Sequence, residues 1–404
     1  MTRINNKHIP VLASFKDCTG CMVCIDSCKF GALSLKIGSD GHYFPKLDIS
    51  KCIGCHTCER KCPVVADFKY IRPVDLKSEP YAAWAKDDKL RLNSTSGGVF
   101  AALAYKVLEK KGLVVGAVSE GCHVRHIIID KFDNLNLLQG SKYLQSMTIG
   151  VYNQVKAVLD DGKLVFFSGT GCQVAGLLSF LQKPYQNLIT ADLVCAGVPS
   201  SFIMEKFCRE EKIIPEKIKW RDKAQGWRHS LQLTVYTRYN QLKYSPKNCF
   251  FGGGFLSGMT NRWSCYNCKF CGLDRLSDFT LADYWGIEGY DEEKFKGISL
   301  MIIHTKKALA LLQEAPITYY KSSWQAALNE NYRLILGRRH ICVERRLLPF
   351  AFKHFSYRTL QKIYGGSIEK NDLLWYPYKL LKYIRFKLTL REIERNKQNL
   401  MRNL

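Results

Sequence analysis

Two runs of cysteine carry the strongest chemical signal in the sequence. Each has the spacing C-x2-C-x2-C-x3-C, and together they comprise Cys18, Cys21, Cys24 and Cys28, then Cys52, Cys55, Cys58 and Cys62. Thiolates at this spacing can surround one iron–sulfur cube, and in two-cluster ferredoxins the fourth cysteine of each run binds the other cluster. The spacing therefore predicts one [4Fe–4S] cluster on Cys18, Cys21, Cys24 and Cys62, and a second on Cys52, Cys55, Cys58 and Cys28. Zinc is the alternative for C-x2-C pairs, but two complete runs favour iron–sulfur clusters.

The segments around these runs are expected to complete a small module. Gly20 and Gly54 suit tight loops whose N–H groups can face cluster sulfurs. Residues 32–49 predict two short strands around a Ser39–Asp40–Gly41 turn. A linker is expected over Ile71–Pro80, where prolines and charges gather.

The larger second region predicts alternating strands and helices. Residues 81–86 read as a strand, and the Ser94–Gly98 loop then opens a helix that ends at Gly112. Such a loop can hold a phosphate at the helix N-terminus, although by itself a plain helix cap is the stronger interpretation. From Lys163 onward, strand, helix, strand and helix follow in turn, which predicts a βαβα unit with parallel strands.

Further cysteines lie where these parallel strands should end. Ligands of open parallel sheets bind beyond the carboxyl ends of the strands, and Cys172 and Cys195 each follow a predicted strand. Cys265 and Cys268 form another C-x2-C pair, with Cys271 just beyond them. These cysteines suggest a third cluster assembled from distant segments, with Cys271 as an alternative ligand. A free buried thiol is the alternative for Cys172 or Cys195 taken singly.

Length, composition and charge set the class of protein. With 404 residues, 47% of them hydrophobic, the chain should form two to three domains and is not disordered. No apolar stretch of ~18 residues and no signal sequence are seen, so the seventeen cysteines are expected to be reduced thiols in a cytoplasmic protein. The net charge is +24, and residues 351–404 hold 12 Lys or Arg against 4 Asp or Glu.

The basic C-terminal region, residues 331–404, predicts a helical tail. A solvated helix packed on the main domain is the favoured interpretation. The alternatives are peripheral contact with the inner face of the membrane, an acidic carrier or another polyanion; nucleic acid is the less favoured partner.

An ordered set of motifs resembles the beta subunit of coenzyme F-420 hydrogenases and dehydrogenases. The motifs, which run from the cysteine module to Trp285, are Ser94–Gly98, Ser141–Ser146, Gly169–Gln173, Asp192–Gly197, Cys265–Cys268, and Arg275 through Ser277 and Asp278 to Asp283–Gly286. With its N-terminal two-cluster ferredoxin, the chain is similar to bacterial members often associated with surface-polysaccharide loci. Two positions depart from the family pattern: Gly171 replaces the usual Pro, and Ala196 replaces the usual His.

The resemblance implies a flavoprotein that carries FAD beside a [4Fe–4S] cluster. It assigns the flavin site to Ser96, Gly97, Gly98, Lys142 and Ser146, and the third cluster to Cys172, Cys195, Cys265 and Cys268. The partners it implies are a ferredoxin-like or other redox carrier and a small-molecule substrate. Nothing in the motifs identifies the deazaflavin as that substrate.

The expected fold is therefore α+β, and the expected protein is an iron–sulfur flavoenzyme. A bacterial-type ferredoxin domain (1–70) precedes an α/β catalytic domain with a partly parallel sheet, divided into parts 71–155 and 156–330, and a basic helical region (331–404) follows. Electrons would pass between the carrier and the substrate through clusters and flavin. The alternative function is a non-catalytic basic iron–sulfur protein that docks on a polyanion or a membrane surface.

Overall fold

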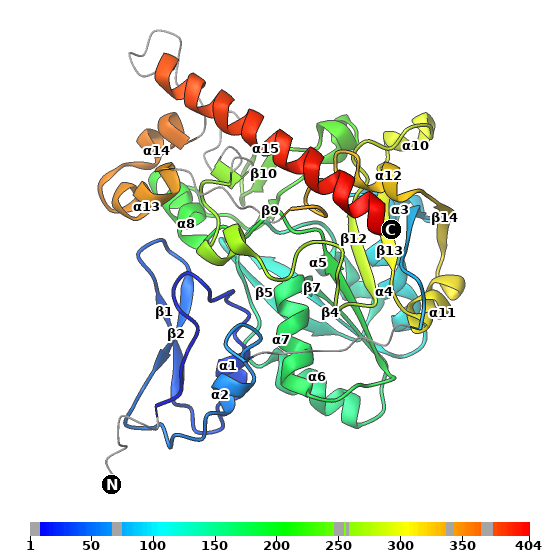
Figure 1. Cartoon of the computed structure of the whole chain (residues 1–404), viewed down its shortest axis with the longest axis horizontal. Coiled ribbons are helices and arrows are strands. Elements are labelled where there is room, and N and C mark those ends of the chain that lie inside the picture. The colour runs from blue at the N-terminus through cyan, green and yellow to red at the C-terminus, as the bar shows by residue number, and fades with distance from the viewer. Residues whose placement is uncertain (1–8, 67–74, 246–253, 256–257, 337–342, 365–374) are drawn as a thin grey trace.

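The computed structural model describes residues 9–66, 75–245, 254–255, 258–336, 343–364 and 375–404 (Figure 1). Residues 71–74 of the expected linker lie outside this part of the chain, and Glu79 and Pro80 belong to a strand instead. Among the described helices, none is long and apolar enough to cross a bilayer.

The N-terminal module is built from two similar halves. Its elements are α1 (Val23–Asp26), β1 (Leu33–Ile37), β2 (Tyr43–Leu47) and α2 (Thr57–Arg60). The strands pair antiparallel across the expected turn. Gly20 and Gly54 both have positive φ, 72° and 69°, and so do Met22 and His56, at 61° and 55°. The duplicated cysteine spacing therefore corresponds to a duplicated backbone shape, in which glycine accommodates the left-handed turn before each helix.

One nine-stranded mixed sheet forms the centre of the molecule. Its order is β14-β3-β13-β12-β8-β7-β4-β5-β6, with bounds β3 (Glu79–Ala85), β4 (Leu113–Glu120), β5 (His123–Ile129), β6 (Ser146–Met147), β7 (Val165–Thr170), β8 (Leu188–Leu193), β12 (Phe279–Asp283), β13 (Ser299–Ile303) and β14 (Ile317–Lys321). The inner strands β12, β8, β7 and β4 run parallel, whereas β13, β3 and β14 add antiparallel partners at one side. Ranges 71–155 and 156–330 thus share a single sheet.

Helices cover both faces of this sheet. They are α3 (Asp88–Leu92), α4 (Val99–Glu109), α5 (Leu135–Leu138), α6 (Val151–Asp160), α7 (Gly171–Leu181), α8 (Ser201–Glu210), α10 (Asp291–Lys294), α11 (Lys306–Glu314) and α12 (Trp324–Leu328). Alternate residues of β7 enter opposite cores: Phe166 packs with α4 and α11, and its neighbours Val165 and Phe167 pack with α6 and α7. The expected βαβα unit is present as β7-α7-β8-α8, with β7 and β8 parallel.

The remaining elements are a small second sheet and the C-terminal helices. A small sheet contains β9 (Lys217–Lys219), β10 (Leu233–Tyr236) and β11 (Gln241–Tyr244). The C-terminal helices are α13 (Val343–His354), α14 (Tyr357–Tyr364) and α15 (Trp375–Asn403). In Figure 1, α15 crosses the molecule and ends near α12 and β14. Ile393 and Leu400 of α15 pack against the core beneath α12.

The N-terminal module docks on helices α6 and α7 of the main domain (Figure 1). Cys21 and Val23 belong to the same core as those helices. The Asp26 carboxylate accepts hydrogen bonds from N of Gly150, at 2.6 Å, and N of Tyr152, at 3.1 Å. These N–H groups lie at the start of α6 and need acceptors from outside the helix. Asp26 therefore caps α6 from another module.

Candidate metal centres and the residues around them

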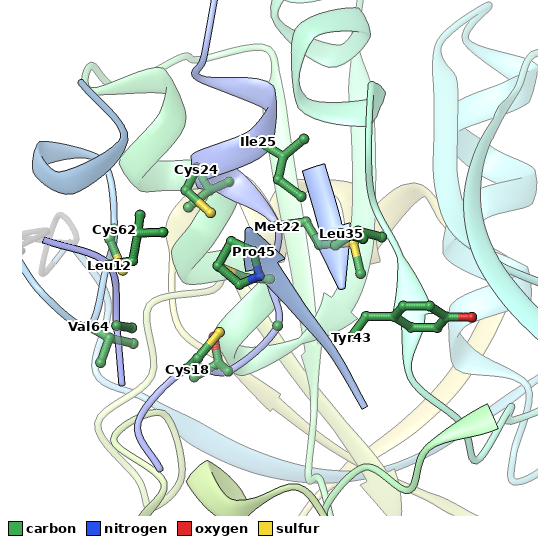
Figure 2. A pocket seen from close by; sticks show the side chains of 15 residues that line it. Leu12, Cys18, Met22, Cys24, Ile25, Leu35, Tyr43, Pro45, Cys62 and Val64 are labelled. Atoms are coloured by element: carbon green, nitrogen blue, oxygen red, sulfur yellow. The ribbon is translucent and has the colours of Figure 1, made fainter. Parts of the chain in front are cut away.

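The eight N-terminal thiols divide between two cavities. One cavity, about 470 Å³ with its open mouth, is lined by Cys18, Cys21, Cys24 and Cys62 (Figure 2). The other, about 320 Å³, is lined by Cys28, Cys52, Cys55 and Cys58. We name these groups the first and second thiol sets. Cys62 lies with the early cysteines and Cys28 with the late ones, which is the crossed arrangement expected for two-cluster ferredoxins.

Both sets have the chemistry that an iron–sulfur cube needs. Burial, followed by the charges of neighbouring cysteines, raises the pKa of Cys21 to about 12, and burial raises that of Cys58 to about 11. Without a metal these thiols stay protonated at neutral pH, so cluster assembly must displace their protons. Within the described ranges, no three Cys, His, Asp or Glu side chains converge closely enough to hold a single ion. Four thiols around each cavity match in number the four cysteine ligands of a [4Fe–4S] cluster.

The two sets differ in their most exposed thiol. Cys18 and Cys21 of the first set are only 8% and 6% exposed, and Cys21 packs in the core with α6 and α7. In the second set Cys58 is equally buried, at 7%, but Cys55 is exposed. The second set therefore reaches the surface through Cys55, whereas no thiol of the first set is exposed.

A third group of cysteines gathers at the carboxyl ends of β7 and β8. Cys172 lies at the start of α7, which begins with a capping box between Thr170 and Gln173. Cys195 follows β8 by two residues. Cys265 is in the short helix Trp263–Asn267, and Cys268 comes directly after it. The location at strand ends is the one expected for a ligand site in a parallel sheet.

Two close backbone approaches bring these distant segments together. A Cβ on Gly171 would lie 2.6 Å from the carbonyl O of Phe270, so only glycine allows this contact. At Gly197, which has a φ of +110°, a Cβ would lie 2.1 Å from Nδ2 of Asn261. Gly171, the departure from the family's usual Pro, thus lets the Cys268 segment approach Cys172.

Burial and neighbouring thiols raise the pKa values of the third group. Burial is the main cause that raises the pKa of Cys172, and it raises the pKa of Cys265 to about 12. The negative charge of Cys195 raises both pKa values further. A hydrogen bond to Cys271 is the largest cause that raises the pKa of Cys268. Sγ of Cys271 also donates to the carbonyl O of Cys268, at 3.1 Å. Cys271 therefore lies beside the four residues assigned by resemblance, and remains the alternative ligand.

The first and third groups meet across helix α7. A Cβ on Gly176 would lie 3.3 Å from Sγ of Cys21. Gly176 is one helical turn after Cys172, so both residues face the same side of α7. The carbonyl O of Cys21 accepts hydrogen bonds from Thr148 Oγ1 at 2.8 Å and Tyr152 OH at 2.9 Å. These contacts hold the N-terminal module in a fixed position relative to the third group.

Arg262 links the first thiol set to the segment that carries Cys265. The buried guanidinium donates through Nη2 to Sγ of Cys18 at 3.3 Å, and through Nε to the carbonyl O of Cys18. Nη1 donates to Oε1 of Gln145, at 3.2 Å, and the same oxygen accepts from N of Tyr43. A permanent cation and an N–H donor therefore lie against a cluster ligand, where they stabilise negative charge.

Sequence reasoning missed Arg262, and it also missed a buried ion pair between Asp40 and Arg345. Arg345 of α13 donates through Nη2 to Oδ2 of Asp40, at 2.5 Å, and both side chains have zero exposure. Asp40 lies in the turn between β1 and β2, where its carboxylate also contacts His42. This contact connects the C-terminal helices directly to the N-terminal module. The position of Arg262 three residues before Cys265 was an available signal, whereas no local pattern pairs Asp40 with Arg345.

The residues assigned to a flavin by resemblance lie in two neighbouring places. Ser96 Oγ donates to the carbonyl O of Ile298 at 2.8 Å, and N of Gly97 donates to Oγ of Ser299 at 2.9 Å. A Cβ on Gly97 would lie 2.4 Å from the carbonyl O of Ala83, so the sheet itself requires this glycine. Gly98 has a φ of 82° and caps α4.

Lys142 lies beside this loop, whereas Ser146 lies farther along the chain near β7. N of Ser141 donates to Oγ1 of Thr95 at 2.7 Å, which joins the two loops. Lys142 Nζ donates to the carbonyl oxygens of Gln139 and Leu137, and burial, then the charge of Lys217, lower its pKa to about 7. Ser146 Oγ lies 2.7 Å from Nδ1 of His126. The assignment of all five residues to a flavin stays a prediction.

Comparison with known proteins gives two family matches. Residues 162–321 match the family described as the C terminus of the coenzyme F420 hydrogenase/dehydrogenase beta subunit, and residues 17–66 match the 4Fe-4S dicluster domain. The chain is similar to the F component of the F(420)H(2) dehydrogenase of Methanosarcina mazei, with 24% identity over 246 residues, 57% of this chain and 66% of that protein. It thus spans just under two thirds of that relative.

Among solved structures, a chain of the xenon-derivatised F420-reducing [NiFe] hydrogenase complex from Methanosarcina barkeri aligns over 73% of this chain and 94% of its own length, with 16% identity and a TM-score of 0.42. The two family matches cover the duplicated cysteine runs and the motifs from Gly169 to Gly286. Over residues 162–321 the chain is therefore similar to the C-terminal part of coenzyme F420 hydrogenase/dehydrogenase beta subunits, and over residues 17–66 it is similar to 4Fe-4S dicluster domains.

Proposed function

We propose that this protein is an iron–sulfur oxidoreductase that moves electrons between its exposed second thiol set and the third group at the edge of the sheet. The observation that carries the proposal is the contact of Cys21 with α7, one helical turn from Cys172. This contact arranges the three cysteine groups in an ordered series, with the first thiol set between the other two. A structural role for the metal centres would not require that order.

The chain's own residues supply what such a path needs. Bound clusters would provide single-electron transfer at potentials set by their surroundings. The main domain excludes water from Cys18 and Cys21. Thr170 Oγ1 lies 3.1 Å from Sγ of Cys172, and N of Gly197 donates to Sγ of Cys195 at 3.4 Å. Such hydrogen bonds favour the negatively charged form of the ligands.

The finer proposal concerns the substrate end. The names of the relatives point to a coenzyme F420-type hydride carrier as a candidate substrate, and hydride transfer joined to single-electron carriers calls for a flavin. Lys142, with a pKa of about 7, is suited to hold or release a proton near the 94–98 loop. The FAD assignment rests on family resemblance, and the link to surface polysaccharides rests on resemblance alone.

Metal and cofactor analysis tests the proposed function. Anaerobically reconstituted protein should bind about twelve irons and twelve sulfides per chain. Cys195→Ser should lose about four irons and leave the N-terminal clusters intact. Cys271→Ser is the matched control and should retain the full count if Cys268 is the ligand. Stoichiometric zinc without sulfide would refute the proposal.

The second candidate function is a non-catalytic iron–sulfur protein that docks on a polyanion. The observation that favours it is the series of exposed apolar side chains in basic helix α15, including Tyr383, Phe386 and Leu388. Flavin content separates the two candidates. Protein that holds all its iron but binds neither FAD nor FMN, and reduces no hydride carrier, would favour the second.

A further inference from the structure

The outward face of the N-terminal module combines exposed apolar side chains with a metal site. Phe30, Ile49 and Ile53 are 50%, 54% and 58% exposed. Phe30 and Ile53 also line the cavity of the second thiol set. Exposed large apolar residues that cluster at one functional site mark interaction surfaces.

Basic side chains surround these apolar residues. Lys29 is exposed beside Phe30, Lys51 is 62% exposed, and Arg60 is exposed at the end of α2. Arg60 donates through Nη1 to the carbonyl O of Cys55 at 2.9 Å, so its charge lies next to the exposed thiol. We call Lys29, Phe30, Ile49, Lys51, Ile53 and Arg60 the Ile53 face.

The acidic groups nearby offset this charge only in part. The Asp48 carboxylate accepts hydrogen bonds from Ser50, and Lys51 lies 3.8 Å away. The Glu59 carboxylate lies 2.7 Å from Nδ1 of His56 and accepts a hydrogen bond from N of Val11. Both carboxylates are engaged within the module, and residues 28–61 contain six Lys or Arg against three Asp or Glu, one of which is the buried Asp40.

The Ile53 face is also the place where an external protein can reach a thiol set most closely. The first set is covered by α6 and α7, whereas Cys55 is exposed at the surface. Interfaces between electron-transfer partners are small and combine an apolar centre with complementary charges. The combination of an exposed ligand, an apolar centre and a basic rim fits a partner with an acidic surface.

We propose that the Ile53 face docks a small acidic one-electron carrier protein. This inference rests on the proposed function and specifies its partner. The apolar centre supplies close packing over Cys55, and Lys29, Lys51 and Arg60 orient the carrier by attraction to its carboxylates. Charged rims of this kind mainly increase the association rate and select against basic partners.

Binding of an oxidised acidic two-cluster ferredoxin to the reconstituted full chain tests the docking surface. The dissociation constant, measured by isothermal titration calorimetry, should rise at least about tenfold for Ile53→Glu and for Lys29→Glu. Ile214→Glu and Lys89→Glu are the matched controls, because both residues are exposed on the main domain; they should bind like wild type. Raising salt from about 0.05 M to about 1 M should weaken wild-type binding.

Several results would overturn the docking proposal. The proposal is overturned if Ile53→Glu and Ile214→Glu bind ferredoxin with equal affinity. It is also overturned if wild type shows no measurable binding, or if its binding does not change with salt. Binding of anionic vesicles that Ile53→Glu abolishes would assign the face to a membrane instead. Iron and sulfide content, measured on the same samples, separates this failure from failure of the proposed function. If Ile53→Glu holds all its iron and sulfide and still binds ferredoxin like wild type, only the docking surface is contradicted.

Discussion

Arg262 Nη2 lies 3.3 Å from Sγ of Cys18, so a buried permanent cation contacts a thiol of the first set. The two residues are 244 positions apart in the sequence. The charge of Arg262 also acts to lower the pKa of Cys265. Burial and the charge of Cys195 act to raise that pKa and have the larger effect. One arginine therefore acts on two of the three cysteine groups.

Removal of this cation should lower the reduction potential of the cluster bound by the first thiol set. Arg262→Gln keeps a donor but loses the charge that stabilises the reduced, more negative state. If the guanidinium raises the equilibrium ratio of reduced to oxidised cluster tenfold, its loss lowers the reduction potential by about 59 mV. Redox titration monitored by electron paramagnetic resonance measures the shift, and Arg358→Gln, at an 81% exposed side chain, should leave the potential unchanged. A first-set potential unaltered in Arg262→Gln would contradict the role of the contact.

Enlargement of Gly176 should loosen the N-terminal module from α7. A Cβ there would lie 3.0 Å from Tyr152 OH and 3.2 Å from Cβ of Cys21, both tighter than ordinary contact. Gly176→Val is expected to reduce the free energy of unfolding by about 1–3 kcal/mol through overpacking. Urea denaturation gives this value, and Gln154→Val, at an exposed position of α6, is the control. A Gly176→Val protein as stable as wild type would show that the docking contact is adaptable.

Loss of Arg345 should be more destabilising than loss of the whole Arg345–Asp40 pair. Arg345→Met leaves Asp40 buried without its cation, at a cost of about 3–5 kcal/mol. The double variant Asp40→Leu/Arg345→Met should recover part of that loss. Chemical denaturation of the single and double variants measures the coupling, and additive losses would show that the two side chains do not depend on each other.

The same pair predicts a pH dependence with a definite sign. Burial opposes ionisation of Asp40, but the hydrogen bond from His42 and the charges of His42 and Arg345 together hold its pKa below the ordinary 3.8. The stabilisation is therefore present above about pH 4 and is lost as pH falls below that value. Wild type should lose more unfolding free energy than the double variant on acidification from about pH 5 to about pH 3.

The sequence predicted those parts of the molecule whose chemistry is local. Ligand spacing repeats within each cysteine run, so the separation into two sets followed from the pattern. Strands β7 and β8 and helix α7 were also predictable, because apolar runs and a Thr170–Gln173 capping box lie within short windows. Arg262, Asp40 and Arg345 were not predictable, because such residues are usually exposed and their partners lie far away in the sequence.

Gly97 shows a different limit of sequence reasoning. A glycine before a helix signals that something approaches the backbone closely, and the family resemblance assigned that approach to a flavin. In the structure the space is taken by the Ala83 carbonyl and N of Ser299. The glycine pattern is the same whether the neighbour is a ligand or a strand, so this glycine by itself is not evidence for a flavin, and the flavin assignment stays a prediction. A Gly97→Val substitution would thus disturb the sheet, so a loss of flavin in that variant would not show that Gly97 contacts the flavin.

Asp26 supplies the start of α6 with acceptors that the main domain lacks at that position. The two modules are therefore not independent units joined end to end, since a helix of one is completed by a carboxylate of the other. A main domain expressed without residues 9–66 would begin α6 with bare N–H groups and would expose the apolar surface that now covers Cys21 and Val23. Exchange of the ferredoxin module between relatives would keep this cap only where the incoming module brings a hydrogen-bond acceptor such as Asp, Asn, Ser or Thr at the position of Asp26.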